Sequence, residues 1–566
     1  MSKQATQQQA SIVEHGRQGT SMKVEAGAGT GKTSTLVMLA NALPRNKGLY
    51  LAFNKSIATE AGRKFPSNFH AATIHSMAFR SVGTHYRNRI EGRDAGRLTP
   101  YRISQHYSYR PMKGLSPLTR AGLVKMTLTN FLASDRKEPG TKDLPFEDIT
   151  RMAMRRNMAQ EDVHWVTVQL AGDARQLWQD ILDDRSGLPM PHDGYLKLWV
   201  DSKPDLGVDT LMLDEAQDAS DLMLSLVKTQ PTQLVLVGDR NQQIYEWRGA
   251  VNIMQRLNDM HTEYLSQSFR FDNRIAGAAN QVLTHLETPV LLDGFDTDRS
   301  TLPNTRAMLF RTNSGVFGEL MERSLGKKQQ QVHVAGGTQD LSSMLTAVEG
   351  LQTGRQTTHP DFIGFEDWGQ YVEAAESYNA PAEMRLLVKV VENYPMALLK
   401  TALKEAEHIK EDNCDISLST AHKGKGREWA HVAIGSDFVL PEANPLCEEK
   451  PFPDEEARLQ YVALTRAQVN LYGAVDMIKA YQSRNAFNQK SKQLANAPHT
   501  ARLLHKLEHT PLADGDAIDR LRKNLDSDEL AVLDTYGPER AIGYLKAQEA
   551  ERESQPTEAC MAGPMV

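Results

Sequence analysis

Residues 26–34, AGAGTGKTS, combine the residue types that bind the phosphates of a nucleotide. Glycines in the loop permit backbone torsions at which several N–H groups point at one anion, and a helix starting after them adds its positive end. Lys32 can reach the β- and γ-phosphates, and the Thr33 hydroxyl can ligate Mg²⁺. Ala26 stands where the strict pattern has glycine. We predict an ATP site that comprises Ala26, Gly27, Ala28, Gly29, Thr30, Gly31, Lys32, Thr33 and Ser34.

Two adjacent acids follow another apolar run, in the sequence LMLDEAQD. Asp214 would hold Mg²⁺ together with Thr33, and Glu215 could polarise the water that attacks the γ-phosphate. Adjacent acids after a strand often only cap a helix, but the phosphate loop elsewhere in the chain makes catalysis the better interpretation. A third apolar run leads to GDRNQQ, where Gln242 could sense the γ-phosphate.

Each of these groups follows a short apolar run, and such runs are typical of buried parallel strands. Ligands of open α/β folds bind at the carboxyl ends of such strands. The sequence therefore predicts a nucleotide-binding α/β lobe. Lys32 and Asp214 are much farther apart than a compact lobe requires, so the segment at about 82–204 is predicted to be an insertion.

The start of this insertion could bind nucleic acid. The segment from Arg80 to Lys125 is rich in Lys and Arg, with Tyr86, Tyr101, Tyr107 and Tyr109 interleaved. Cations neutralise phosphates and aromatic rings stack on bases, so this mixture suits a single strand. An ordinary solvated surface is an equally good interpretation. A second aromatic and cationic group, Tyr245, Trp247 and Arg248, follows the third apolar run.

Composition limits the class of protein. The 566 residues suggest two to four domains, and the net charge of −6 means that any nucleic-acid binding depends on a local patch. The three cysteines, Cys414, Cys447 and Cys560, lack paired spacing, which fits a reducing compartment. No apolar run suits a membrane span or a signal peptide. We predict a cytoplasmic protein that has no membrane partner.

The ordered motifs resemble those of superfamily 1A helicases of the UvrD type, over about residues 6–472. Details such as YLAFNKSIA and STAHKGKGREW are most similar to the helicase region of the F-box DNA helicase family, with bacterial and phage versions the natural comparison. Two positions depart from the pattern, because Ile74 replaces a usual Phe and Arg427 a usual apolar residue. The matching stretches are TQQQASIVEH, LAFNKSIATEA, ATIHSMAF, LDEAQD, GDRNQQIYEWRGA, YLSQSFRF, LSTAHKGKGREWAHV and EEARLQYVALTRAQ.

The resemblance implies further roles. Gln9, or alternatively Gln8, would read adenine, Phe269 would pack on it, and Glu428 would lie near the nucleotide. Arg270 would contact the γ-phosphate, and Arg466 would be the arginine finger. The implied catalytic set is Lys32, Asp214, Glu215, Gln242, Arg270 and Arg466. The implied DNA-binding set is Phe53, Asn54, Thr73, His75, Tyr245, Trp247, Arg248 and His422.

The fold expected from the resemblance is α/β, with two RecA-like parallel-sheet lobes that carry mainly helical insertions. The first lobe would take residues 1–81 and 205–265, and its insertion residues 82–204. The second lobe would take residues 266–340 and 412–482, with a reduced insertion at 341–411. Residues 483–566 would form a C-terminal extension with a disordered end.

We therefore expect an ATP- and Mg²⁺-dependent DNA helicase that moves 3′→5′ on single-stranded DNA and opens duplexes, as a monomer. Repair, replication and recombination are all possible settings, and repair or recombination proteins are possible partners. One alternative is an ATPase switch or remodeller that binds nucleic acid without translocating. Another is the motor subunit of a helicase–nuclease system, although no nuclease constellation follows the last motif.

Overall fold

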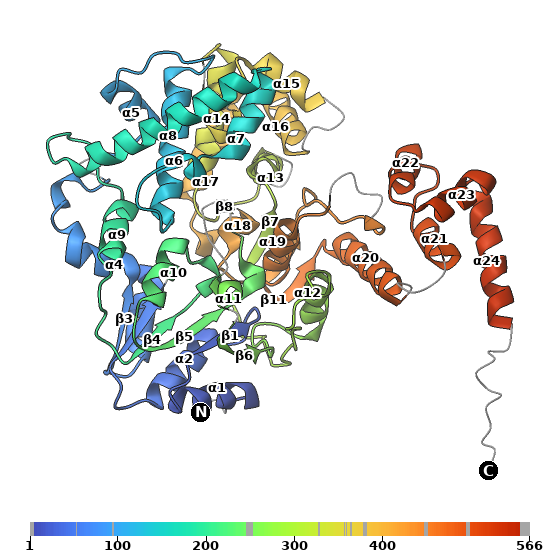
Figure 1. Ribbon diagram of the computed structural model, residues 1–566, viewed down its shortest axis with the longest axis horizontal. Helices are drawn as coiled ribbons and strands as arrows, with labels where there is room; N and C mark the ends of the chain where they lie inside the picture. The colour runs from blue at the N-terminus through green and yellow to red at the C-terminus, as the bar shows by residue number, and fades with distance from the viewer. Residues whose placement is uncertain are drawn as a thin grey trace.

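The computed structural model describes residues 5–52, 54–92, 96–244, 253–257, 259–325, 329–355, 357, 359–362, 365–376, 382–445, 451–493 and 499–554. Two parallel sheets organise the chain (Figure 1). Among the described residues, none of the helices has the length and apolar content that crossing a membrane requires.

The first sheet has six parallel strands in the order β3-β2-β4-β5-β1-β6. Strands β1, β2 and β4 are buried at every position. In β2 and β4 this burial explains the mainly apolar sequence, whereas β1 also buries the charged residues Lys23 and Glu25. The strands are β1 (Met22–Ala26), β2 (Gly48–Ala52), β3 (Phe69–Thr73), β4 (Thr210–Leu213), β5 (Gln233–Gly238) and β6 (His261–Leu265).

The second sheet has five parallel strands in the order β11-β10-β7-β9-β8. The strands are β7 (Arg306–Phe310), β8 (Val332–Val334), β9 (Ile416–Thr420), β10 (Trp429–Ile434) and β11 (Ala467–Tyr472). Two parallel sheets are what two RecA-like lobes require, so the predicted fold class is confirmed.

Helices surround both sheets. Those near the first sheet are α1 (Gln7–Arg17), α2 (Lys32–Asn41), α3 (Lys55–Lys64), α4 (Ile74–Ala78), α10 (Asp221–Lys228) and α11 (Ile253–Arg256). Those near the second are α12 (Asn273–His285), α13 (Asn313–Leu325), α18 (Ala421–Gly424), α19 (Asp454–Leu464) and α20 (Val475–Gln493).

Two groups of helices interrupt the sheets and lie beside each other (Figure 1). The first is α5 (Pro100–His106), α6 (Pro117–Ala133), α7 (Phe146–Arg155), α8 (Gln160–Leu182) and α9 (His192–Asp201). The second is α14 (Gln339–Gln352), α15 (Trp368–Glu376), α16 (Ala382–Asn393) and α17 (Met396–His408). They touch where the Arg155 guanidinium lies 4.1 Å from the centre of the Phe365 ring.

The C-terminal helices form a unit of their own beyond α20 (Figure 1, red). They are α21 (His499–Glu508), α22 (Gly515–Lys523), α23 (Ser527–Tyr536) and α24 (Pro538–Ser554). Leu503, Leu521, Leu533 and Leu545 form a separate small core between them. The exact domain boundaries proposed from the sequence stay predictions.

Candidate nucleotide site and nucleic-acid interface

The loop between β1 and α2 has a backbone that favours glycine. Gly29 has a φ of +75° and Gly31 a φ of +79°, both in the left-handed region. A Cβ built on Gly29 would lie 2.6 Å from Ser268 Oγ and 2.6 Å from Arg270 Cβ. A side chain at this position would therefore strain the backbone and also collide with the segment that follows β6.

Strand β4 delivers the two predicted acids to this loop. Asp214 is only 5% exposed, and its Oδ2 accepts hydrogen bonds from Thr33 Oγ1 at 3.0 Å and from the Tyr50 hydroxyl at 2.7 Å. Glu215 Oε2 lies 3.9 Å from Lys32 Nζ. The structure thus brings together Lys32, Thr33, Asp214 and Glu215.

The surroundings shift the pKa values of Asp214 and Glu215 in opposite directions. Burial, followed by the charge of Glu215, raises the pKa of Asp214. Burial also favours the neutral form of Glu215, but Lys32 and Lys425 outweigh it and lower the pKa of this carboxyl. Glu215 is therefore ionised near neutral pH, which is the form that a general base needs.

Thr33 and Asp214 could hold a metal ion. Their hydroxyl and carboxylate oxygens already contact each other beside the phosphate loop. Mg²⁺ binds through one or two carboxylates plus phosphate oxygens and waters, so this pair of hard oxygen donors fits it. The raised pKa of the buried Asp214 fits as well, because a cation would take the place of a proton there.

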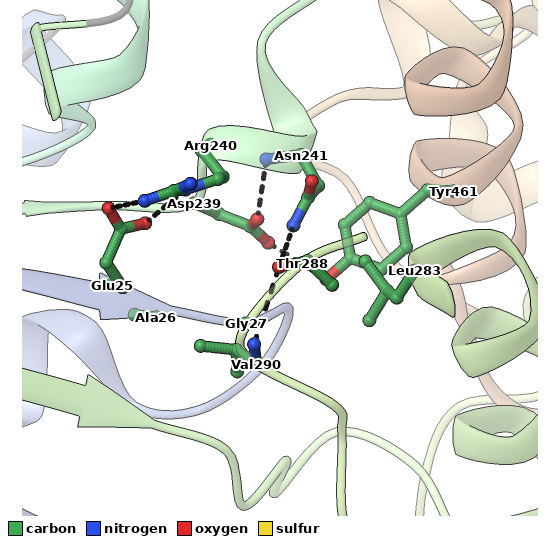
Figure 2. Close-up of a pocket in the computed structure, with 10 residues that line it drawn as sticks. All are labelled: Glu25, Ala26, Gly27, Asp239, Arg240, Asn241, Leu283, Thr288, Val290 and Tyr461. Carbon is green, nitrogen blue, oxygen red and sulfur yellow. Dashed lines mark hydrogen bonds and ion pairs between the residues drawn. The ribbon is translucent and has the colours of Figure 1, made fainter. Parts of the chain in front are cut away.

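A tyrosine from α19 contacts both the phosphate loop and the residue that follows β5. The buried Tyr461 hydroxyl donates to Asp239 Oδ2 at 2.9 Å and accepts from the Ala28 N–H at 3.0 Å. Figure 2 shows Tyr461 and Asp239 there, with the ion pair between Arg240 and Glu25 on the adjoining side. Elements of the second sheet and the phosphate loop are therefore in direct contact.

Two predicted arginines converge on the same place. Arg466 is 1% exposed, and its Nη2 donates to Gln242 Oε1 at 3.2 Å. Burial and the nearby Arg270 cation lower the pKa of Arg466 to about 9. Arg270 pairs with Glu428 at 2.5 Å and donates to the Thr465 carbonyl at 2.9 Å. Burial disfavours a charge on Glu428, but Arg270 outweighs it and lowers the pKa of that carboxyl.

The candidate adenine end lies at α1. Gln9 Nε2 donates to Thr35 Oγ1 at 3.2 Å, and the Gln9 side chain also caps α1. Gln8 Oε1 instead accepts from the Ser266 N–H at 3.0 Å. The Phe269 N–H donates to the Gly29 carbonyl at 2.9 Å. Both candidate glutamines and Phe269 thus lie near the phosphate loop, and the choice of Gln9 stays a prediction.

The sequence analysis assigned no role to four residues that the structure places in this site: Lys425, Asp218, Tyr50 and Tyr461. Lys425 pairs with the buried Asp218 and donates to the Gln242 carbonyl at 2.6 Å. Tyr50 and Tyr461 bind the two buried aspartates described above. Lys425 and Asp218 lie within the helicase-like motifs, next to residues that were given a role, so their nearness to the site could have been predicted. Their pairing with each other depends on the tertiary fold.

The proposed DNA-binding residues are spread over both sheets. Asn54 and Thr73 cap α3 and α4 by accepting from the N–H groups of Ile57 and Ser76. His75 Nε2 lies 2.9 Å from Asp193 Oδ1, which joins α4 to α9. His422 is on α18 near the second sheet. Phe53, Tyr245, Trp247 and Arg248 lie outside the described residues.

Some basic residues of the segment from Arg80 to Lys125 are engaged within the protein. Arg89 donates to the carbonyls of residues 181, 183 and 188, and Arg120 makes two bonds to Asp173. Tyr107 and Tyr109 stack on each other at 5.4 Å. Tyr101, by contrast, is 64% exposed. Part of the segment therefore braces the protein itself. Neither of the two interpretations that the sequence left open, nucleic-acid binding or a solvated surface, included this role.

Comparison with known proteins gives consistent matches. An AAA domain family matches residues 8–248, and a UvrD-like helicase C-terminal domain family matches residues 365–475. The chain is 30% identical over 497 residues to F-box DNA helicase 1 of Gallus gallus. The aligned region covers 82% of this chain and 48% of that protein.

Two other relatives agree. F-box DNA helicase protein 1 of Schizosaccharomyces pombe is 27% identical over 497 residues, with 80% of this chain and 55% of that protein covered. A probable DNA helicase II homolog of Mycoplasma genitalium is 25% identical over 377 residues, with 46% and 54% covered. The chain spans about half the length of these curated relatives.

Proposed function

The chain belongs to the UvrD-like superfamily 1 DNA helicases, which bind ATP, and we propose that it moves 3′→5′ along single-stranded DNA and unwinds duplexes. One observation carries the proposal: groups suited to the γ-phosphate come from both sheets. Lys32 and Glu215 lie beside the first sheet, and Arg466, which follows α19 of the second, reaches Gln242 at the end of the first.

In the proposed chemistry, the phosphate loop binds ATP and Lys32 contacts its terminal phosphates. Glu215 accepts a proton from the attacking water, while Arg270 and Arg466 stabilise the charge that develops on the transferred phosphoryl group. Thr33 and Asp214 would hold Mg²⁺, which would neutralise phosphate charge. Arg270 must release Glu428, and Arg466 must turn from Gln242, to reach a phosphate.

The proposed movement follows from this division. Residues 1–81 and 205–265 form one lobe, and residues 266–340 and 412–482 form the other. ATP bound between them attracts both, and hydrolysis removes the link, so the lobes close and open once per ATP. DNA contacts around Thr73 and His75 on one lobe and His422 on the other would then grip in turn.

Unwinding of tailed duplexes tests the polarity. The full chain, ATP and Mg²⁺ are mixed with a duplex that carries a single-stranded tail on either its 3′ or its 5′ end. We expect strand separation from the 3′-tailed duplex only, and none with Lys32→Ala. Preference for the 5′ tail would overturn the direction. Hydrolysis that depends on DNA without separation of either substrate would favour a remodeller.

A further inference from the structure

A group of metal-ligating side chains lies away from the nucleotide site, between α1 and the edge strand β6. His15 is near the end of α1, and His261 and Glu263 are on β6. One nitrogen of each imidazole and one Glu263 oxygen lie within 4.8 Å of one another. Figure 1 shows α1 and β6 close to each other at the base of the first sheet.

The donor atoms converge on one point. His15 Nδ1 lies 2.6 Å and His261 Nε2 lies 2.9 Å from the same oxygen, Glu263 Oε1. The two rings are 4.5 Å apart between their centres. Neighbouring ligands of a tetrahedral zinc ion are about 3.3 Å apart, so small side-chain rotations would make room for the ion.

The surroundings also suit a bound ion. The side chain of Glu263 is only 13% exposed, while those of His15 and His261 are 38% and 40% exposed, which leaves a route from solvent. Ser11 Oγ donates to both Glu263 oxygens at 3.3 Å and so orients this carboxylate. Hydrogen bonds of this kind from outer groups strengthen metal sites.

We propose that His15, His261 and Glu263 bind Zn²⁺. Two imidazoles and a carboxylate are zinc ligands, whereas Mg²⁺ and Ca²⁺ prefer oxygen donors alone. Three protein ligands leave a fourth position for water. The ion would be a cross-link between the N-terminal helix and the edge strand.

The cross-link has a structural consequence near the candidate adenine end. Helix α1 also carries Gln8 and Gln9, which bond to Ser266 and Thr35. Ser266 directly follows β6. Zinc at one end of the α1–β6 contact would therefore hold in place both the helix and the start of the segment that leads to Phe269.

The test is zinc binding to the chelator-treated full chain without nucleotide, measured by calorimetry and by metal content after gel filtration. His261→Ala and Glu263→Gln are compared with His164→Ala, which removes an exposed histidine on α8. Loss of outer-shell partners already weakens metal sites by about 10–100-fold. We expect the two site variants to lose one equivalent, or to bind it at least tenfold more weakly, and the control to match the wild type.

Hydrogen exchange gives a second readout that does not depend on enzymatic activity. Zinc should slow amide exchange in α1 of the wild type and of His164→Ala, and should have no effect on α1 in Glu263→Gln, which retains a polar side chain of the same size. Equal zinc stoichiometry and affinity in all four proteins would overturn the proposal. In that case the three side chains form a hydrogen-bonded cluster that holds no ion.

Discussion

Glu215 and Asp214 show how position alone divides the tasks of two neighbouring acids. Asp214 faces Thr33 and Tyr50 in a buried place that raises its pKa, whereas Glu215 faces cations that lower its pKa. The first is suited to a metal ion and the second to a proton.

Replacing Glu215 separates ATP binding from hydrolysis. We expect Glu215→Gln to lower kcat for ATP hydrolysis by about 10²–10⁴-fold, the usual loss when a general base is removed. ATP affinity should be kept, because Lys32 and the loop are unchanged. Steady-state kinetics and nucleotide binding measure the two effects. Glu60→Gln, at an exposed partner of Lys64, is the control. A small loss like that of the control would exclude Glu215 as the base.

At the scale of elements, the phosphate loop depends on how closely β6 and its following segment approach it. Gly29 has a positive φ and no space for a Cβ because of Ser268 and Arg270. Gly19 has a φ of +81°, but a Cβ there would meet nothing within 4 Å. These two glycines thus separate backbone strain from close approach.

We predict that Gly29→Ala loses ATP binding by at least tenfold, while Gly19→Ala keeps it. Both variants incur backbone strain of about 1 kcal/mol, and only the first forces the loop away from Arg270. Nucleotide binding and thermal denaturation measured on both proteins distinguish the two effects. Equal ATP affinity in the two variants would show that the close approach of the loop is unimportant for binding.

The elements around the nucleotide were predictable because local pattern determines them. The strands predicted before Lys32, Asp214 and Gln242 are present as β1, β4 and β5. The basic segment was harder, since its charges are matched by residues distant in sequence, as Arg120 is by Asp173. The small core of α21–α24 was also missed, because its leucines are spread over four short helices.

At the scale of the whole molecule, buried contacts join the two sheets beside the nucleotide site. Lys425, beside the second sheet, pairs with Asp218, beside the first sheet, and Tyr461 binds Asp239. Separation of the lobes would break these bonds and expose their polar groups. The contacts therefore favour the closed arrangement.

Asp218 makes this arrangement sensitive to pH. Burial raises the pKa of Asp218 to about 6, although Lys425 opposes the shift. The folded chain therefore binds more protons than the unfolded chain between about pH 4 and pH 6, and the contribution of Asp218 to stability falls as pH rises through that window.

We predict that Asp218→Asn removes this component from the pH dependence of stability. Relative to the variant, the wild type should lose up to ~3 kcal/mol of unfolding free energy between pH 4 and pH 6. Chemical denaturation across this range measures the difference. Parallel curves for the two proteins would contradict the assignment.

The central claim is that one ATP site is built from both lobes and is coupled to DNA. ATP hydrolysis by the full chain with and without single-stranded DNA, for wild type, Lys32→Ala and Arg466→Ala, tests it most directly. We expect strong stimulation by DNA in the wild type, abolition by Lys32→Ala, and a loss of about 10³-fold or more in Arg466→Ala. A rate that ignores DNA, or one that survives the loss of Arg466, would contradict the account.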